Sequence, residues 1–411
     1  MFDVVIVGGG PVGACAGALL ARGAGKGGAL SVALLEPRAP ALLAAPAGSA
    51  VAAPDVRVVA LSRASENVLT HAGAWARIRA LRLSPYERMR IWHESVQPAS
   101  EAVLVFDAAD VGEPNLGYIV ENRLLQQALL EAFAQAGGHI EPAALESLDV
   151  TDTEARVATA GATLTARLVV GADGSQSALR AAAGLGARVS SYRQTAIVAT
   201  VRTARPHQST AWQRFMKDGT LAFLPLADGT SSIVWSADEA LAAGLLRLGD
   251  AAFAAELDRA SDLALGATQL ASERVAVPLM RLSATRYVAP RVALLGDAAH
   301  VVHPLAGQGV NLGLLDAASL AQLVAAAVGA REDPGALSVL RAYERWRKSE
   351  VAAMATAIDV FDRLLAHGRD PVARLAQRGL SWVNRSQELR RFFIRRALGV
   401  SGELPEAARA R

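Results

Sequence analysis

Apolar positions near the start of the chain fall in the order strand, helix, strand. Residues 2–7 (FDVVIV) form a continuous run rich in β-branched side chains, which stops at Gly8. Residues 11–22 are mostly small and compatible with a helix, and a second apolar run over residues 30–35 ends at Glu36. This order is typical of a βαβ unit, so we expect two parallel strands here.

The rest of the chain divides into α/β, β-rich and helical stretches. Apolar residues recur at helical spacing over residues 121–136, and residues 168–170 are a short apolar strand. Residues 190–285 contain alternating segments such as TAIVATV, TLAFLPL and SSIVWS, which predict antiparallel strands. The α/β pattern returns at residues 291–297, and the pattern after residue 304 is helical. We therefore expect an α/β domain interrupted by a β-rich insert.

Composition narrows the class of protein. The chain has 411 residues, which at roughly 150 residues per domain favours two to three domains. Hydrophobic residues make up 52% and charged residues 20%, which excludes a disordered chain. The 42 basic and 39 acidic side chains leave a net charge of +3, which gives no reason to expect nucleic acid as a partner. A single Cys excludes a disulfide framework and a Cys-rich zinc site, and it fits a reducing compartment.

The apolar N-terminal stretch does not match an export signal. Asp3 stands where a positive start is expected, and glycines interrupt the stretch before the apolar part of a signal. The longest uncharged helical stretch, residues 317–330, is shorter than the about 20 apolar residues that span a bilayer. We therefore expect a cytoplasmic protein, either soluble or peripheral to the inner face of the membrane.

The first strand is followed directly by a glycine-rich turn of the form GxGxxG. Gly8 allows the tight turn, Gly10 lets the backbone approach a pyrophosphate, and Gly13 lets helix and strand pack closely. Glu36, at the end of the second strand, is placed to accept hydrogen bonds from an adenosine ribose. The pattern predicts dinucleotide binding over a purely structural glycine turn, and it does not distinguish NAD from FAD.

Two downstream motifs resemble those of one enzyme family. Residues 171–180 (GADGSQSALR) and 294–317 (LLGDAAHVVHPLAGQGVNLGLLDA) resemble the DG and GD motifs of the class A flavin monooxygenases, which have the p-hydroxybenzoate-hydroxylase-like fold. The resemblance continues through DVRVVALS, YERMRIW, GYIVENRLL, AWQRF, LAFLPLADG, RYVAPRVALLGDAAH and LGVSGELP. Together these segments, in order over nearly the whole chain, resemble the ubiquinone-biosynthesis hydroxylases, flavoproteins that hydroxylate a polyprenylated phenol.

The resemblance implies a fold and a division into domains. The expected fold is an α/β FAD-binding Rossmann-like domain with a β-rich substrate domain inserted and a helical C-terminus. The expected ranges are 1–85, 101–185 and 286–370 for the FAD-binding domain, 86–100 and 186–285 for the substrate domain, and 371–411 for the C-terminal helical segment.

The resemblance also implies cofactor-binding residues. Gly296 and Asp297 form the GD motif, in which the acceptor-only carboxylate of Asp297 suits the ribityl hydroxyls. Arg123 resembles the family's pyrophosphate-binding arginine. The guanidinium group suits this role, since it can donate two hydrogen bonds to the anion. Arg57 resembles the family's flavin-side arginine. For both arginines the alternative is a surface or structural ion pair.

Two further cofactor residues keep alternatives open. The resemblance places Asp173 of the DG motif near the FAD pyrophosphate and the path of the reductant, whereas a helix N-cap is an equally good interpretation. Gly174 beside it gives close backbone approach. Asn311, one turn into the helix after the GD motif, is expected to touch the flavin ring, and its alternative is a structural polar residue.

The reactive edge of the flavin is expected next to a proline and a short loop. Pro304 is expected to shape the wall there. Gly307, Gln308 and Gly309 head a helix, so their amides can face flavin N1 and the C2 carbonyl, where negative charge accumulates on reduction.

Other candidate residues are assigned no catalytic role. Asp297, His300 and His303 are spaced three residues apart, but no fourth ligand is nearby, so we predict no metal site. His303 is expected either near the flavin or as a buried structural residue. Cys15 is expected to be a packed small hydrophobe. Aromatic residues of the insert are expected either to line an aromatic substrate pocket or to pack in the core. They are Tyr192, Trp212, Phe215, Phe223 and Trp235.

The resemblance implies an FAD-dependent aromatic-ring monooxygenase. Reduced flavin forms a C4a-hydroperoxide with O₂, and an electron-rich phenol attacks its distal oxygen. NAD(P)H or another electron donor is expected to bind transiently, because the sequence has no second GxGxxG. The alternatives are a same-fold enzyme acting on another phenol or an isoprenoid, and a non-catalytic flavin-bound subunit of a biosynthetic complex. Other ubiquinone-biosynthesis proteins are possible partners.

The C-terminal segment concentrates positive charge. Residues 371–411 contain nine Arg and three acidic residues. Residues 372–383 place apolar and basic side chains on opposite sides of a helical wheel, whereas Arg396 interrupts the apolar side of residues 389–398. Such a helix either lies on an anionic bilayer or packs its apolar side on the protein.

Overall fold

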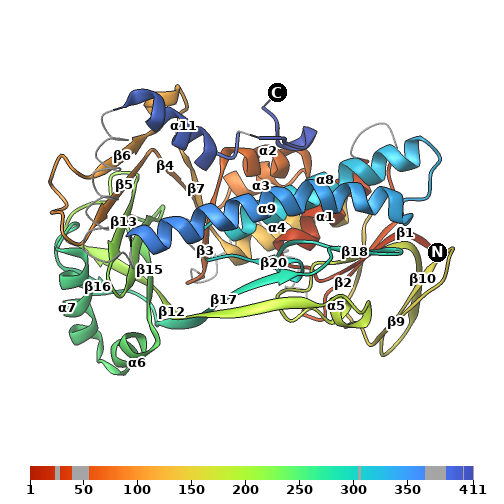
Figure 1. Ribbon diagram of the computed structural model, residues 1–411, viewed down its shortest axis with the longest axis horizontal. Coiled ribbons are helices and arrows are strands. Elements are labelled where there is room, and N and C mark those ends of the chain that lie inside the picture. The colour runs from red at the N-terminus through yellow and green to blue at the C-terminus, as the bar shows by residue number, and fades with distance from the viewer. Residues whose placement is uncertain (24–27, 39–54, 304–306, 366–385, 401, 411) are drawn as a thin grey trace.

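The two ends of the molecule differ in architecture. The computed structural model describes residues 1–23, 28–38, 55–303, 307–365, 386–400 and 402–410. An α/β part that holds the N-terminus occupies one end, and a β-rich part occupies the other (Figure 1). The long helix α9 (Leu337–Leu365) runs along the length of the molecule between them.

The N-terminal βαβ unit is confirmed. It consists of β1 (Phe2–Val7), α1 (Pro11–Arg22) and β2 (Val32–Leu35), and β1 pairs in parallel with β2. The second strand starts at Val32, two residues later than the apolar run of residues 30–35 predicts. The sheet around this unit contains β18 (Val288–Ala289), β19 (Val292–Leu294), β11 (Thr163–Gly171), β1, β2 and β8 (His139–Glu141) in that spatial order, with β10 (Ala155–Ala158) and β9 (Ser147–Val150) attached to β11.

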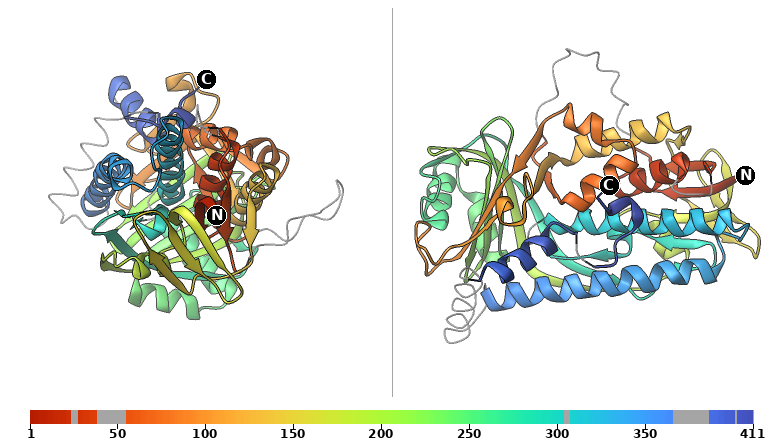
Figure 2. Two further views of the ribbon diagram at one scale, coloured as in Figure 1. Left: turned by 90° about the vertical axis from the view of Figure 1, so that its right-hand side faces the viewer. Right: turned by 90° about the horizontal axis from the view of Figure 1, so that it is seen from above.

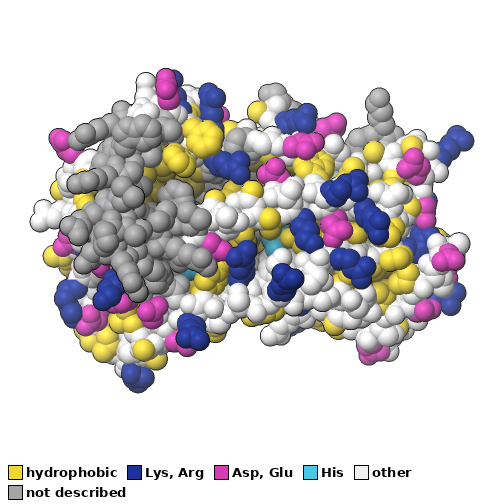
Figure 3. All heavy atoms as spheres, in the orientation of Figure 1, with side chains coloured by type: hydrophobic (Ala, Val, Ile, Leu, Met, Phe, Trp, Pro, Cys, Tyr) yellow, Lys and Arg dark blue, Asp and Glu magenta, His cyan; other side chains and the backbone are white. Residues whose placement is uncertain are grey.

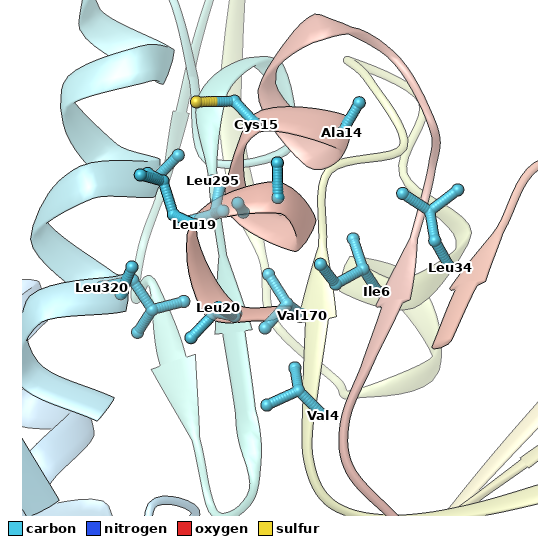
Figure 4. Packing of buried hydrophobic residues seen from close by; sticks show 14 of the residues in the cluster. Val4, Ile6, Ala14, Cys15, Leu19, Leu20, Leu34, Val170, Leu295 and Leu320 are labelled. Atoms are coloured by element: carbon cyan, nitrogen blue, oxygen red, sulfur yellow. The ribbon is translucent and has the colours of Figure 1, made fainter. Parts of the chain in front are cut away.

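Helices bury this sheet, which explains why β1 is apolar without alternation. Val4, Val5 and Ile6 are fully buried, as expected for a parallel strand covered on both faces. Leu19 of α1 packs near Val170 of β11 and Leu320 of α8 (Gln308–Gly329) (Figure 4). The α/β core is therefore continuous from the first strand to the C-terminal helices.

A larger, mainly antiparallel sheet forms the β-rich part, as the alternating segments predict. Its strands are β20 (His300–Val301), β17 (Val275–Ala284), β12 (Ala187–Thr203), β15 (Ser231–Asp238), β14 (Gly219–Pro225), β13 (Thr210–Met216), β5 (Arg88–His93) and β6 (Leu104–Asp107) in spatial order, with β16 (Thr268–Leu270) paired to β12. Two helices, α6 (Glu239–Arg247) and α7 (Asp250–Ser261), cover one face. The domain ranges stay a prediction. Strands β6 and β20 belong to this sheet, although both lie outside the ranges 86–100 and 186–285 proposed for the substrate domain.

A small sheet connects the two parts. It contains β3 (Val58–Leu61), β7 (Gly117–Glu121) and β4 (Leu83–Tyr86). Strand β3 contacts α8 and β4 contacts β14, so the small sheet bridges the α/β and β-rich parts. The remaining short elements are α2 (Arg63–His71), α3 (Trp75–Arg79), α4 (Asn122–Gln135), α5 (Ala178–Ala182), η1 (Ala108–Val111), η2 (Gly296–Ala298) and η4 (Glu406–Ala408).

The described residues after residue 307 are mainly helical, as predicted, and α8 lies beside α9 (Figure 2). Helix α8 is long and apolar enough to cross a membrane by length and composition, which corrects the expectation that no stretch reaches that length. However, 67% of its apolar window is buried inside the protein, which is typical of a core helix. The last described helix, α11 (Gln387–Ala397), packs on β6 and η1, whereas residues 372–383 lie outside the described residues.

Candidate functional site

The glycine-rich turn after β1 is closely packed at two of its three glycines. Gly8 has a positive φ of 104°, and a Cβ there would lie 2.5 Å from the carbonyl oxygen of Ala172. A Cβ on Gly13 would lie 1.9 Å from the carbonyl oxygen of Gly8. Gly10 differs, because a Cβ there would meet nothing within 4 Å. The first and third glycines therefore allow the turn to form, while the second borders open space.

Two side chains hold this turn from outside. The Glu36 carboxylate accepts hydrogen bonds from the backbone amides of Gly9 at 2.8 Å and Arg38 at 3.1 Å. On α4, the Gln126 side-chain amide donates to the carbonyl oxygen of Gly9 at 2.9 Å. The sequence predicts Glu36 but not Gln126. The available signal for Gln126 is its place directly after GYIVENRLL, one turn into α4.

Three motifs that are far apart in the sequence meet at one cavity, which we call the cofactor cavity. Its volume is about 540 Å³. The carboxyl ends of parallel strands β1 and β11 lie at the same sheet edge, which brings the glycine-rich turn and the DG motif together. Residues lining the cavity include Gly8, Gly10, Glu36, Arg57, Asn122, Asp173, Gly174, Asp297 and Gly309.

Asp173 leaves an acceptor free at this cavity. Its Oδ2 accepts a hydrogen bond from the amide of Leu179 at 3.0 Å. The N-cap of α5 is nevertheless Ser177, whose hydroxyl accepts from the amide of Arg180, so the N-cap interpretation of Asp173 is wrong. Asp173 Oδ1 is buried and has no hydrogen-bond partner among the described residues. An orphaned carboxylate oxygen beside a cavity fits a ligand that carries hydroxyl groups.

Asp297 presents its carboxyl to the same cavity. Its side chain keeps access to solvent through the cavity, although the surrounding wall partly encloses it. This burial raises the pKa of Asp297, and the charge of His300 opposes the shift. Gly296 beside it has a positive φ of 53°, which lets the chain turn at the end of β19. The acceptors Glu36, Asp173 and Asp297 and the open space at Gly10 therefore fit FAD.

The loop ahead of α8 lies between two cavities. Gly307 has a positive φ of 64° and is the N-cap of α8. Gly309 lines the cofactor cavity, whereas Gly307 and Gln308 line a second cavity. The helix N-terminus carries a partial positive charge, so it can stabilise negative charge in either space. Pro304 lies outside the described residues.

The second cavity, which we call the sheet cavity, lies on the face of the large sheet opposite α6 and α7. Its volume is about 340 Å³. Alternate residues of β12, β14 and β15 and residues 211–213 of β13 form its floor, and Tyr86, Met89 and Ala397 are among its other lining residues. Arg57 and Asn122 line both cavities. The two cavities therefore meet at these residues and at the start of α8.

Two residues expected at the cofactor are absent from the residues that line either cavity. Asn311 is 3% exposed, and its side chain accepts from the amide of Ser62 at 3.0 Å and donates to the carbonyl oxygen of Ala60 at 2.8 Å. Its hydrogen-bonding groups are occupied by the protein, so the structural interpretation replaces the flavin contact. Arg123 has an exposed side chain and is absent from the residues that line either cavity, so its pyrophosphate role stays a prediction.

The histidines after the GD motif have protein partners. His300 Nε2 lies 2.6 Å from Asp316 Oδ2, and His303 Nε2 lies 3.1 Å from Gln194 Oε1. Both histidines are buried, so His303 matches the structural interpretation. Cys15 is fully buried, and burial raises the pKa of its thiol to about 12, as expected for a packed small side chain.

The aromatic residues of the β-rich part do not form one pocket. Trp212 is among the residues that line the sheet cavity, but it also packs against the cluster that contains Phe223 and Trp235. Phe223 and Trp235 instead pack with Phe253 of α7 on the opposite face, so an aromatic pocket is wrong for them. Phe215 packs near α9, and Tyr192 stacks edge-on against His303. Strand register explains the division, because Trp212 is the cross-strand partner of Phe223, whereas Phe215 is opposite Thr220 on the other face.

The comparisons with known proteins agree with this geometry. The family model described as "FAD binding domain" matches residues 1–357. The chain is 38% identical over 411 residues to ubiquinone hydroxylase UbiL of Rhodospirillum rubrum, which covers 99% of this chain and 92% of that protein. It is 35% identical over 405 residues to 3-demethoxyubiquinol 3-hydroxylase of Escherichia coli, which covers 97% of this chain and 98% of that protein.

Solved structures support the fold. The p-nitrophenol 4-monooxygenase PnpA of Pseudomonas putida superposes with a TM-score of 0.75 at 19% identity, covering 96% of this chain and 98% of that one. The anhydrotetracycline hydroxylase OxyS of Streptomyces rimosus gives a TM-score of 0.71 at 18% identity, covering 98% and 77%. The predicted α/β and β-rich fold with a helical C-terminus is thereby confirmed. The chain belongs to the FAD-binding-domain family and, within it, to the ubiquinone-biosynthesis hydroxylases, which are class A flavin monooxygenases.

Proposed function

We propose that this protein hydroxylates the aromatic ring of a polyprenylated phenol in ubiquinone biosynthesis, with FAD as its cofactor. One observation supports this most directly. The sheet cavity and the cofactor cavity are neighbours, because Arg57 and Asn122 line both and the N-terminus of α8 borders both. A ring bound on the sheet would thus face the reactive end of a flavin bound at the three motifs. The two bacterial relatives, a ubiquinone hydroxylase and a 3-demethoxyubiquinol 3-hydroxylase, point to the same substrate class.

Residues of the cofactor cavity have separate roles in this proposal. The carboxylates of Glu36, Asp173 and Asp297 accept hydrogen bonds from the cofactor's hydroxyl groups. Amides at the start of α8, at Gln308 and Gly309, stabilise negative charge on the flavin ring. Bound and reduced FAD supplies the activation of O₂. NAD(P)H or another donor binds transiently as the reductant.

Residues around the sheet cavity orient the ring and exclude water. Apolar side chains of the sheet, among them Val198, Leu224 and Val234, form most of its floor. An apolar, water-poor space prevents the activated oxygen from being lost before it reaches the ring. Arg57 lines both cavities, so this residue can contact the cofactor and the ring at once.

The substrate class is tested by deleting the gene. We expect a quinone intermediate to accumulate whose ring lacks one oxygen, as identified by mass spectrometry, and the gene on a plasmid should restore the normal pool. An unchanged quinone pool would reject this substrate. Accumulation of a different phenol or an isoprenoid would assign the enzyme to another pathway.

We also propose that α11 contacts the membrane surface. Its inner side is packed, because Ile394 is fully buried and Arg391 donates to the carbonyl oxygen of Asp110 at 2.8 Å. Phe392, by contrast, is 59% exposed, and Arg395 is also exposed. Figure 3 shows hydrophobic side chains beside basic ones over this helix. Since Ala397 lines the sheet cavity, the cavity lies next to the surface proposed to meet the lipid.

Membrane contact is tested by sedimentation with vesicles that contain phosphatidylglycerol. Phe392→Ser combined with Arg395→Gln should reduce the bound fraction, because it removes an exposed apolar anchor and a positive charge. Leu241→Ser combined with Arg247→Gln makes the same kinds of change on α6 and should leave binding unchanged. Equal binding by all three proteins, or no binding by the wild type, would contradict the proposal.

A further inference from the structure

Three polar side chains stand on the mostly apolar floor of the sheet cavity. Gln213, Thr220 and Ser236 are 5%, 6% and 2% exposed, respectively. All three line the cavity, and none has a hydrogen-bond partner for its side chain among the described residues. The described part of the protein does not pair these hydroxyl and amide groups, so water or a ligand in the cavity supplies their hydrogen-bond partners.

Strand register places the three side chains next to one another. Thr220 of β14 and Ser236 of β15 are direct cross-strand partners. Gln213 of β13 is opposite Ala222, which lies two residues from Thr220 and so points to the same face. Side chains in direct and diagonal positions across strands are close enough to share one small ligand. The three residues, which we call the polar trio, therefore form one patch.

The cavity around the polar trio is short of charge. Among the described residues that line it, Arg57 and Tyr86 are the ionisable ones. Burial raises the pKa of Tyr86 to about 12, so this hydroxyl stays protonated at neutral pH. No described lining residue is a carboxylate or a histidine that would remove a phenol proton. Groups bound at the trio are therefore recognised by neutral donors and acceptors.

We infer that the polar trio binds the oxygen substituents of the substrate ring and selects an oxygenated, uncharged ring. The inference rests on the proposed function, which places the ring in this cavity. Hydroxyl and amide groups both donate and accept, so the trio suits phenol, methoxy and carbonyl oxygens. Because Gly307 and Gln308 line the same cavity toward α8, holding the ring by its oxygens fixes which carbon faces the flavin. The trio thereby acts as the specificity determinant of the sheet cavity.

The test compares two ring ligands on the FAD-loaded protein without any reductant. Titration calorimetry measures dissociation constants for 2-(3-methylbut-2-enyl)phenol and for (3-methylbut-2-enyl)benzene, which lacks the hydroxyl. We expect the wild type to bind the phenol about tenfold more tightly, since one net hydrogen bond is worth about that factor. In the Thr220→Val/Ser236→Ala double variant, which keeps Gln213, the ratio of the two constants should fall toward one.

Matched variants separate recognition from damage to the fold. Ser232→Ala removes a buried hydroxyl from the same strand outside the cavity lining, and it should keep the wild-type ratio. Thr220→Ser retains a hydroxyl and should keep it too. Equal binding of the two rings by the wild type, no binding of either, or an unchanged ratio in the double variant would overturn the inference. Because no reductant is present, a retained preference without hydroxylation in a separate assay would instead reject the proposed function.

Discussion

The Asp316 carboxylate accepts a hydrogen bond from the backbone amide of Gly296, with 3.0 Å between Oδ2 and the nitrogen. Asp316 lies on α8 and is fully buried, while Gly296 begins the GD motif. The other carboxylate oxygen of Asp316, Oδ1, lies 2.7 Å from Nε of Arg347 on α9. One buried carboxylate therefore ties the GD motif to the helix that starts between the two cavities.

Removing the cation from this network should destabilise the protein. Arg347→Met leaves the buried Asp316 without its arginine, and uncompensated buried charges cost about 3–5 kcal/mol. We expect a loss of about 3 kcal/mol in the free energy of unfolding of the apo protein, measured in urea. Arg345→Met changes an exposed arginine on the same helix and should have little effect. Similar stability for both variants would contradict the role given to the network.

The same network predicts how stability depends on pH. Burial alone raises the pKa of Asp316, but the charges of His300 and Arg347 and their hydrogen bonds outweigh it and lower the pKa. A carboxyl with a lowered folded pKa stabilises the protein above its unfolded value of about 4, and the contribution is lost as the pH falls further. The stability difference between the wild type and Asp316→Asn should be present above about pH 4 and shrink as the pH falls below that value. A difference that grows on acidification would be inconsistent with this sign.

Two glycines of the first turn should behave differently when changed to alanine. Gly10→Ala has room within the protein but extends into the cofactor cavity, so we expect the apo protein to fold while FAD affinity falls at least about tenfold. Gly13→Ala would clash with the carbonyl oxygen of Gly8 and should unfold the turn itself. Flavin absorbance and thermal unfolding of the apo proteins measure the two effects. Gly161→Ala is the control, because a Cβ there also meets nothing within 4 Å.

Phe223 should affect stability and not the coupling of oxidation to hydroxylation. It is 2% exposed and packs with Trp235 and Phe253 beneath α7, away from the sheet cavity. Phe223→Ala should therefore lower the free energy of unfolding by about 3–5 kcal/mol, as truncation of a core aromatic does. The amount of product formed per NAD(P)H oxidised should stay at the wild-type value. A stable variant that releases H₂O₂ in place of product would instead place Phe223 in the cavity.

Local sequence patterns predict the elements well, but they do not tell which face of a strand is the functional one. The βαβ unit and its GxGxxG turn are visible because their signals are continuous in sequence. The alternation in β14 shows two faces, yet Phe223 and Thr220 are assigned to core and cavity only when α7 is seen to cover one of them. The face of the large sheet that carries Phe223 and Trp235 is the one that packs against α7.

Long-range partners explain the other errors. Asn311 lies in a motif shared with flavin enzymes, but its partner Ser62 is 249 positions away in the chain, so sequence spacing does not indicate the contact. Asp316 lies near the end of the same motif. A single carboxylate on an apolar helix gives no sequence signal for a role in the site. Its partners come from three elements, and the network becomes visible when these elements pack together.

Hydroxylation with labelled oxygen tests the joined cavities most directly. The FAD-loaded protein is incubated with NADH, ¹⁸O₂ and 2-(3-methylbut-2-enyl)phenol, and the products are analysed by mass spectrometry. We expect a ring-hydroxylated product that carries one ¹⁸O atom, formed only when the phenol, reductant and protein are all present. A product that takes its oxygen from water, or phenol-independent oxidation of NADH without a hydroxylated product, would contradict the account.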